Sequence, residues 1–249
     1  MPAFLILTFK KVRWKSFHAR NMKIKDKVVL ITGSSSGIGK STSIAFARKS
    51  AKLVLTYNKT KEGGEETLKE CKKYSEALLV QLDVRDDNSI NNLVKEIINH
   101  FRKIDIVINN SGIVVIKDFD KQTFEDIENH INVNLTGAMK LTHAFLPYLK
   151  KQDEALIINI ASAYSKVVDS EVVPYCASKF GLRGFTQALA LELPKNVRTY
   201  VVNPGLTATR MTNFSGVAVE KVADIIVKTA EETLNKKSGD DIDLKDYVK

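Results

Sequence analysis

The sequence predicts an α/β fold, a single domain in which helices cover both faces of a doubly wound parallel sheet. Three observations support this prediction. From Lys27 onward, short apolar runs rich in β-branched residues alternate with segments of helical periodicity. A glycine-rich turn joins the first run to the first helical segment, and no linker, internal repeat or low-complexity tract interrupts the chain. Strands that alternate with helices in this way form βαβ units, whose parallel sheet is buried on both faces.

Short apolar runs that are each followed by a helical segment are the predicted strands. They span residues 27–33, 52–57, 77–84, 105–112, 156–162 and 198–205. A lysine- and glutamate-rich helix is expected after residue 57, and the other predicted helices span residues 40–50, 89–103, 123–150, 175–192 and 218–235. The C-terminal segment 238–249 is a candidate for a last short strand. Right-handed crossovers between such strands place a ligand at the carboxyl ends of the sheet.

The composition is that of a globular protein, with 44% hydrophobic and 27% charged residues. The formal net charge is +9, but the lysines are spread along helical segments, so we interpret them as a solvated surface rather than a nucleic-acid site. Cys71 and Cys176 have neither disulfide nor metal-ligand spacing and are typical of a reducing compartment. We therefore predict a cytoplasmic protein with no nucleic-acid partner and no metal.

Residues 1–21 are predicted to be a basic N-terminal extension of the domain formed by residues 22–249. The apolar run at residues 3–9 is too short to span a bilayer, and the basic cluster follows it, whereas a secretory signal places its charges first. Three interpretations stay open: a peripheral basic anchor, an organellar presequence, or a segment upstream of a natural start at Met22. We assign it no function and predict no integral membrane segment.

The glycine-rich turn has the sequence TGSSSGIG and runs from Thr32 to Gly39. Gly33 permits the tight turn, Gly37 lets the backbone approach a pyrophosphate, and Gly39 allows the helix to pack closely on the strand. The N-terminus of the helix that follows offers unpaired N–H groups to phosphate. The turn therefore predicts a dinucleotide site.

Tyr175 and Lys179 are four residues apart in a predicted helix, so their side chains lie on one face, one turn from each other. Reduction of a ketone needs a proton donor at the developing alkoxide, and oxidation of an alcohol needs a base. A phenol with an ordinary pKa of about 10 is a poor base at neutral pH. We expect the Lys179 ammonium to lower the pKa of Tyr175 and make it usable in both directions.

Further motifs follow in order, and together they resemble the classical short-chain dehydrogenase/reductase family. The TGxxxGxG turn is joined by LDV at residues 82–84, NNSG at 109–112, YCASK at 175–179 and PGLTATRM at 204–211. The similarity covers the chain from Lys25 to about Met211. It implies a Rossmann-like oxidoreductase that transfers hydride between a nicotinamide cofactor and a carbonyl or secondary alcohol.

The resemblance implies a catalytic set of Asn134, Ser162, Tyr175 and Lys179. Ser162 ends a predicted strand, where its hydroxyl can donate to the substrate oxygen. Asn134 is expected to bend its helix and to hold a water that links Lys179 to solvent. Lys179 would also hold the hydroxyls of the nicotinamide ribose.

The predicted cofactor site combines the glycine turn with the ends of several strands. In it, Asp83 would accept from the adenine amino group, and the Leu206 backbone and Thr209 would lie beside the nicotinamide carboxamide. Its members are Gly33, Ser35, Ser36, Gly37, Ile38, Gly39, Tyr57, Asn58, Asp83, Val84, Asn110, Gly112, Tyr175, Lys179, Pro204, Gly205, Leu206 and Thr209. The short segment after Met211 predicts an open substrate pocket. Its expected walls are Val114, Val115, Ala163, Tyr164, Val168 and Met211.

The end of the second predicted strand favours NADP(H) over NAD(H). Selection of NAD normally needs a carboxylate there to bind the adenosine ribose. Tyr57 occupies that place, followed by Asn58, Lys59 and Lys61. No acid occurs before Glu62, so nothing there repels a 2′-phosphate, and the two lysines can attract it. Many NADP-preferring relatives carry a basic residue inside the glycine turn, where this chain has Ser36. Ser36 and Asn58 can donate hydrogen bonds to the phosphate but supply no charge.

The alternatives are an NAD(H)-dependent alcohol dehydrogenase of the same family and a non-catalytic dinucleotide sensor. A sensor has no need of Tyr175 and Lys179, which argues against it. A nucleic-acid-associated methyltransferase fold has no use for the TGSSSGIG turn or for the YCASK motif. We read His18, His100, His130 and His143 as structural or surface residues, since they lack ligand spacing. By analogy, a homodimer or homotetramer joined through the helices of Asn134 and Tyr175 is expected.

Overall fold

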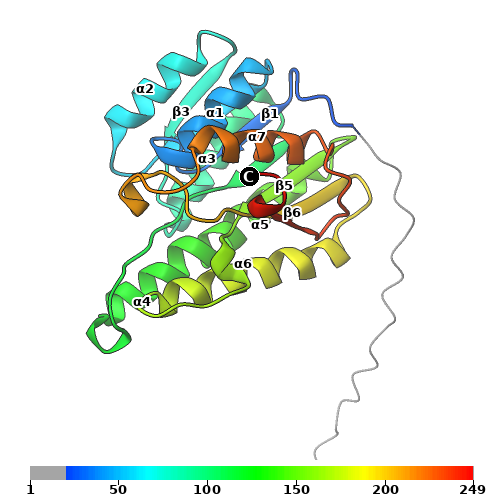
Figure 1. The fold of residues 1–249 in the computed structure, drawn as a ribbon. Coiled ribbons are helices and arrows are strands. Elements are labelled where there is room, and N and C mark those ends of the chain that lie inside the picture. Colours follow the sequence, from blue (N-terminus) through cyan, green and yellow to red (C-terminus); the bar gives the residue numbers. More distant parts are fainter. Residues whose placement is uncertain (1–20, 249) are drawn as a thin grey trace, which may run out of the picture.

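The computed structural model describes residues 21–248 and contains a seven-stranded parallel sheet between two layers of helices (Figure 1). The strand order is β3-β2-β1-β4-β5-β6-β7. The strands are β1 (Val28–Ile31), β2 (Lys52–Tyr57), β3 (Ala77–Gln81), β4 (Ile106–Asn109), β5 (Ala155–Ile160), β6 (Val197–Asn203) and β7 (Asp241–Asp243). The order reverses between β1 and β4, and such a switch point opens a crevice at the carboxyl ends of the strands. The predicted fold class is confirmed.

Helices cover both faces of this sheet. They are α1 (Gly37–Arg48), α2 (Lys61–Cys71), α3 (Asp87–Phe101), α4 (Phe124–Ile131), α5 (Gly137–Leu149), α6 (Val173–Glu192) and α7 (Val219–Ala230). α1 and α7 pack against each other on one face, and α3 and α5 pack together on the other (Figure 1). Within the described residues, no helix is both long and apolar enough to cross a membrane.

Alternate residues of β1 face opposite helical layers. Val29 and Ile31 belong to the cluster that contains Phe46 of α1, whereas Val28 and Leu30 belong to the cluster of α3 and α5. All four β1 side chains are buried. A strand buried on both faces needs apolar residues at every position, and this explains the continuous apolar runs of the sequence.

The predicted helix over residues 123–150 is in fact two helices separated by a π-helical turn at Asn132–Thr136. Asn134 lies in this turn, and its side chain hydrogen-bonds outside its own helix. A π-helical turn shifts the backbone hydrogen bonds by one residue, and such turns occur frequently at functional sites. Apolar periodicity could not show this break, because helical spacing continues across it.

The C-terminal candidate segment does form a strand, β7, which pairs in parallel with β6. Ion pairs fix its position: Asp241 binds Arg183 of α6 at 2.8 Å, and both Asp241 and Asp243 bind Lys166. Most of the predicted N-terminal extension lies outside the described residues. Met22, where the predicted domain begins, is buried and donates its backbone N–H to the Glu231 carbonyl at 3.2 Å.

Candidate active site

The glycine turn follows β1 at the switch point. Gly33 and Gly37 have φ angles of +68° and +53°, in the left-handed region that side chains disfavour. A Cβ on Gly39 would lie 2.2 Å from the Gly33 carbonyl oxygen, well inside contact distance. The turn therefore closes as it does only because these positions lack side chains.

Thr32 fastens the glycine turn to the end of β4. Its Oγ1 accepts hydrogen bonds from the backbone N–H groups of Asn110 and Ser111, both at 2.9 Å. In return, the Asn110 amide donates to the Thr32 carbonyl at 2.8 Å. Sequence reasoning placed Asn110 in the site but gave Thr32 no role. Its position directly before the first glycine of the turn was the available signal.

The N-terminus of α1 fits a phosphate group. The first turn of an α-helix has N–H groups without intrahelical partners, and they carry a partial positive charge. Here the N-cap residue Ser36 makes no side-chain capping bond, and the first turn contains no acidic residue. The Thr209 methyl group would lie 3.2 Å from a Cβ on Gly37, so the loop after β6 passes close to this helix end. These donors are available to an anionic ligand.

Polar side chains gather where β2 and β3 end. Arg85 donates to both carboxylate oxygens of Asp83, with Nη2 to Oδ2 at 2.7 Å. These hydrogen bonds lower the pKa of Asp83, although partial burial opposes the effect, so its carboxylate is ionised at neutral pH. Asn58 is exposed nearby, while the Val84 side chain is buried against Gly137. Only the backbone of Val84 can therefore face a cofactor.

Tyr175, Ser162 and Lys179 converge beyond the end of β5. Burial raises the pKa of the Tyr175 phenol, and a hydrogen bond with Ser162 opposes this rise. Lys179 lies on the same helix face, with Nζ 5.6 Å from the centre of the Tyr175 ring. Its ammonium donates to the Ile160 carbonyl at 2.9 Å. Burial lowers the pKa of Lys179 to about 8.

The direction of the Tyr175 pKa differs from the sequence expectation, in which Lys179 lowers it. Two features explain the difference: removal of the phenol from water disfavours the phenolate, and the ammonium points at a carbonyl oxygen rather than at the phenol. Tyr175 is therefore protonated at neutral pH in this structure. A buried, protonated phenol is suited to donate a proton.

Asn134 connects the π-helical turn to two other segments. Its Oδ1 accepts from the Ile113 N–H at 2.8 Å, and its Nδ2 donates to the Ile113 carbonyl and to Ser178 Oγ, each at 3.0 Å. A Cβ on Gly112 would lie 3.4 Å from Asn134 Oδ1 and 3.5 Å from Lys179 Nζ. The structure thus brings Asn134, Gly112 and Lys179 together. Ser178 was missed by sequence reasoning, because the spacing that singled out Tyr175 and Lys179 says nothing of the serine between them.

The loop after β6 is short and internally braced. The Val217 N–H donates to the Leu206 carbonyl at 2.9 Å, and the Ala208 N–H donates to the Val217 carbonyl at 2.8 Å. Gly216 has a φ of +107°, and a Cβ there would lie 2.2 Å from the Leu206 carbonyl oxygen. The Pro204 carbonyl accepts from the Ala163 N–H at 2.8 Å, which joins the loop to the end of β5.

One of the expected substrate-pocket walls, Tyr164, lies against Tyr175. The ring of Tyr164 meets that of Tyr175 edge-on, with centroids 6.2 Å apart. Val168 and Met211 are exposed, while Val114 and Val115 are partly buried. His130 is buried and accepts from the Val115 N–H at 3.0 Å, in agreement with a structural role. No cluster of potential metal ligands occurs within residues 21–248.

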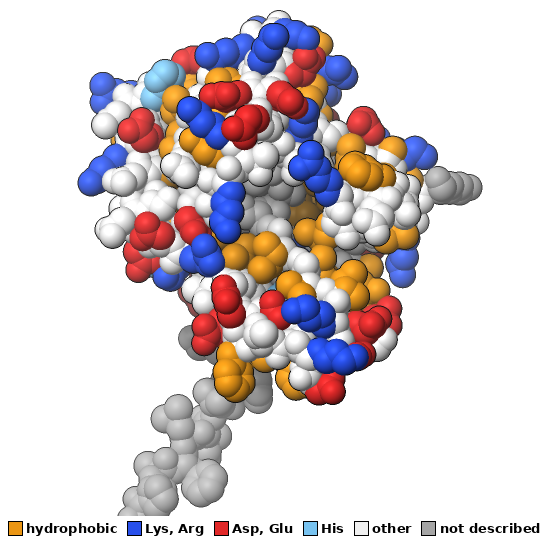
Figure 2. All heavy atoms as spheres, turned by 90° about the vertical axis from the view of Figure 1, so that its left-hand side faces the viewer, with side chains coloured by type: hydrophobic (Ala, Val, Ile, Leu, Met, Phe, Trp, Pro, Cys, Tyr) orange, Lys and Arg blue, Asp and Glu red, His pale blue; other side chains and the backbone are white. Residues whose placement is uncertain are grey.

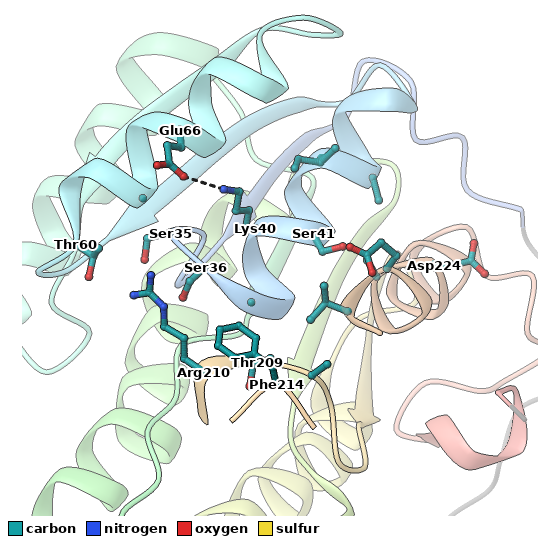
Figure 3. Close-up of a pocket in the computed structure, with 18 of the residues that line it drawn as sticks. Ser35, Ser36, Lys40, Ser41, Thr60, Glu66, Thr209, Arg210, Phe214 and Asp224 are labelled. Carbon is teal, nitrogen blue, oxygen red and sulfur yellow. Dashed lines mark hydrogen bonds and ion pairs between the residues drawn. The ribbon is translucent and has the colours of Figure 1, made fainter. Parts of the chain in front are cut away.

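A groove of about 820 Å³ lies on the other side of the glycine turn (Figure 3). It is bounded by α1, the start of α2, α7 and the loop after β6. Figure 2, viewed from the left of Figure 1, shows a hollow with lysine and arginine side chains around its rim. The groove reaches the glycine turn at Ser35, Ser36 and Gly37, and from there it runs along α1 toward Lys49.

Comparison with known proteins identifies the family. The model of the short chain dehydrogenase family matches residues 27–218, which is most of the chain. The chain belongs to the short-chain dehydrogenase family. It is therefore an oxidoreductase that acts on a carbonyl or alcohol group with a nicotinamide cofactor.

Individual relatives support this assignment. The chain is 33% identical over 193 residues to an uncharacterized oxidoreductase of Staphylococcus saprophyticus, covering 76% of this chain and 78% of that one. It is 34% identical over 197 residues to the 3-oxoacyl-[acyl-carrier-protein] reductase FabG of Thermotoga maritima, covering 77% and 78%. A short chain dehydrogenase of Burkholderia cenocepacia, solved in complex with NADP, superposes with a TM-score of 0.82 at 25% identity, covering 89% of this chain and 97% of that one.

Proposed function

We propose that this short-chain dehydrogenase is NADP(H)-dependent and transfers hydride between the cofactor and a carbonyl or secondary alcohol, with Tyr175 as the acid/base. The observation that carries the proposal is the convergence of Tyr175, Ser162 and Lys179 beside the glycine turn. Asn134 completes the set from the π-helical turn.

In this proposal, Tyr175 transfers the proton. Because burial raises its pKa, the phenol holds its proton at neutral pH and can deliver it to a carbonyl oxygen as that oxygen becomes an alkoxide. The Ser162 hydroxyl can donate a second hydrogen bond to the same oxygen and stabilise its charge. The nicotinamide, when bound, supplies the hydride.

Lys179 is suited to resupply the proton. A group titrates readily near its pKa, and that of Lys179 is about 8. Its Nζ lies on the same side of the helix as Tyr175 and would also reach the ribose hydroxyls of the cofactor. Asn134 acts as a positioning residue, because it fixes the Ile113 backbone and Ser178, and Ser178 in turn donates to the Tyr175 carbonyl at 2.7 Å.

The preference for NADP(H) rests on the end of β2. Tyr57 and Asn58 stand there without a carboxylate, and Ser36 is exposed in the glycine turn. The Burkholderia relative solved with NADP supports the same choice. An NAD(H)-dependent enzyme of the same family is the alternative, and comparison of both cofactors decides between them.

The test is turnover with NADPH and NADH against a panel of ketones, aldehydes and secondary alcohols. The panel includes a 3-oxoacyl thioester, because relatives of this chain are 3-oxoacyl-carrier-protein reductases. We expect oxidation of NADPH with at least one carbonyl substrate, at higher kcat/KM than with NADH. Equal or better efficiency with NADH would overturn the cofactor preference. Tight cofactor binding without turnover on any substrate would favour the non-catalytic sensor.

The proposal includes a homodimer or homotetramer in the cytoplasm. Exposed apolar side chains on α5 and α6 support the assembly: Met139, Val173, Phe180 and Leu191. Light scattering of the purified protein measures the oligomeric state. A monomer at micromolar concentration would contradict this part of the proposal.

A further inference from the structure

We infer that Arg210 supplies the positive charge for the 2′-phosphate of the cofactor, and that it does so from the loop after β6. This inference rests on the proposed NADP(H) dependence and names the residue that produces it. Ser36 and Asn58 at the expected position carry no charge, so attraction of the 2′-phosphate depends on a cation that faces them.

Arg210 faces the glycine turn across the groove. Figure 3 shows its guanidinium directed toward Ser35 and Ser36, with Thr60 beyond them at the start of α2. All four residues line the same groove. The end of β2, where Tyr57 and Asn58 stand, leads directly into Thr60. The guanidinium therefore occupies the side of the turn on which the adenosine ribose is expected.

The other cations that line the groove already have partners. Lys40 binds Glu66 at 3.0 Å, and Lys49 binds Glu231 at 2.8 Å. Arg48 lies over the Tyr74 ring, 5.5 Å from its centre. Arg210 is the one groove-lining cation that forms no ion pair, side-chain hydrogen bond or aromatic contact within residues 21–248.

The acidic residues at this end of the groove form no ion pair with Arg210 within the described residues. Glu66 is paired with Lys40, and Glu62 lies in the first turn of α2. Lys61 in the same turn pairs with Glu65 at 3.5 Å, and Lys59 stands two residues before Lys61. A dianionic phosphate between Ser36, Thr60 and Arg210 would thus meet two hydroxyl donors and an unpaired guanidinium.

The loop holds Arg210 in place by its backbone. Arg210 begins a short helical turn that extends to Thr212, and the Phe214 N–H closes the loop on the Thr209 carbonyl at 2.8 Å. Thr209 itself packs on Gly37. The residue next to Arg210 is therefore anchored on the glycine turn, and the side chain has a short reach to the phosphate. A planar guanidinium binds phosphate in a bidentate manner, which lysine cannot reproduce.

The test is calorimetric binding of two fragments, adenosine 2′,5′-bisphosphate and adenosine 5′-monophosphate, to the wild type and to Arg210→Ala. The fragments differ only in the 2′-phosphate, and no turnover is needed. We expect Arg210→Ala to weaken the bisphosphate on the order of 10–100-fold, as for loss of a charged hydrogen-bonding partner, and to change monophosphate binding by no more than about 3-fold. Arg48→Ala, an arginine elsewhere in the same groove, is the matched control and should leave both unchanged.

A compensating variant strengthens the test. Ser36→Arg in the Arg210→Ala background restores a charge inside the glycine turn and should recover most of the bisphosphate affinity. Equal weakening of both fragments by Arg210→Ala would overturn the inference, because Arg210 would then act on the shared 5′-phosphate. Unchanged bisphosphate binding would overturn it as well. A wild type that does not discriminate between the fragments would instead overturn the proposed NADP(H) preference itself.

Discussion

Replacement of Lys179 by methionine should stabilise the protein while it abolishes turnover. Lys179 is 4% exposed, and burial lowers its pKa from an ordinary 10.5 to about 8. Near neutral pH, this fall in pKa means that burial of the ammonium costs about 3 kcal/mol of folding free energy. Methionine has a similar length and no charge, so Lys179→Met removes this cost.

The variant also loses a hydrogen bond. Lys179 Nζ donates to the Ile160 carbonyl at 2.9 Å, and a buried carbonyl left without a donor costs about 1 kcal/mol. We therefore expect Lys179→Met to be more stable by about 2 kcal/mol near pH 7. For a chain of this size that is a rise in Tm of roughly 4–8 °C. Urea unfolding of both proteins, without cofactor, measures the difference in free energy of unfolding.

The pH dependence separates this explanation from simple repacking. Between the folded pKa of about 8 and the unfolded value of 10.5, the unfolded chain holds a proton at Lys179 that the folded chain has lost. In this pH window, the free energy of unfolding of the wild type therefore rises with pH relative to that of Lys179→Met. The advantage of the variant should shrink toward zero by about pH 10. A variant that is less stable at pH 7, or whose advantage does not depend on pH, would show that the buried ammonium does not cost the wild type stability.

Three further predictions concern the cofactor site and the domain boundary. Gly39→Ala should abolish detectable NADPH binding in a fluorescence titration, because its Cβ would lie 2.2 Å from the Gly33 carbonyl oxygen. Binding within 10-fold of wild type would show that the glycine turn tolerates a side chain at this position. Tyr57→Asp should move the ratio of kcat/KM for NADPH over NADH toward NADH by about 10-fold or more, and an unchanged ratio would show that β2 does not select the cofactor. A chain that starts at Met22 should fold and retain turnover within about 2-fold, whereas loss of soluble protein would show that residues 1–21 belong to the domain.

Much of the fold could be predicted because buried parallel strands need continuous apolar runs. The runs around Val29 and Ile157 needed nothing more than this pattern and the short connections between elements. The sequence pattern that predicts β7 is weaker, because its only buried apolar residue is Ile242. Its flanking aspartates are held by ion pairs with distant residues. Such pairings depend on tertiary structure and have no local signature.

The predicted catalytic residues are brought together, but their electrostatics could not be predicted from spacing. The four-residue interval between Tyr175 and Lys179 says that they share a helix face, not which way the ammonium points. Its contact with the Ile160 carbonyl and the burial of the phenol decide the pKa values, and both depend on packing. The position of Arg210 could not be predicted for a similar reason, because its relation to Ser36 arises only when the loop after β6 folds over the glycine turn.

Tyr175→Phe keeps the ring and removes the proton, so this variant shows whether Tyr175 is the acid/base. Single-turnover reduction of the best carbonyl substrate should slow by at least ~10²-fold, and NADPH affinity should stay within about 3-fold of wild type. Tyr148→Phe, which lies on α5 beside Lys151, is the matched control and should react at the wild-type rate. A Tyr175→Phe rate within a few-fold of wild type would show that Tyr175 is not the acid/base.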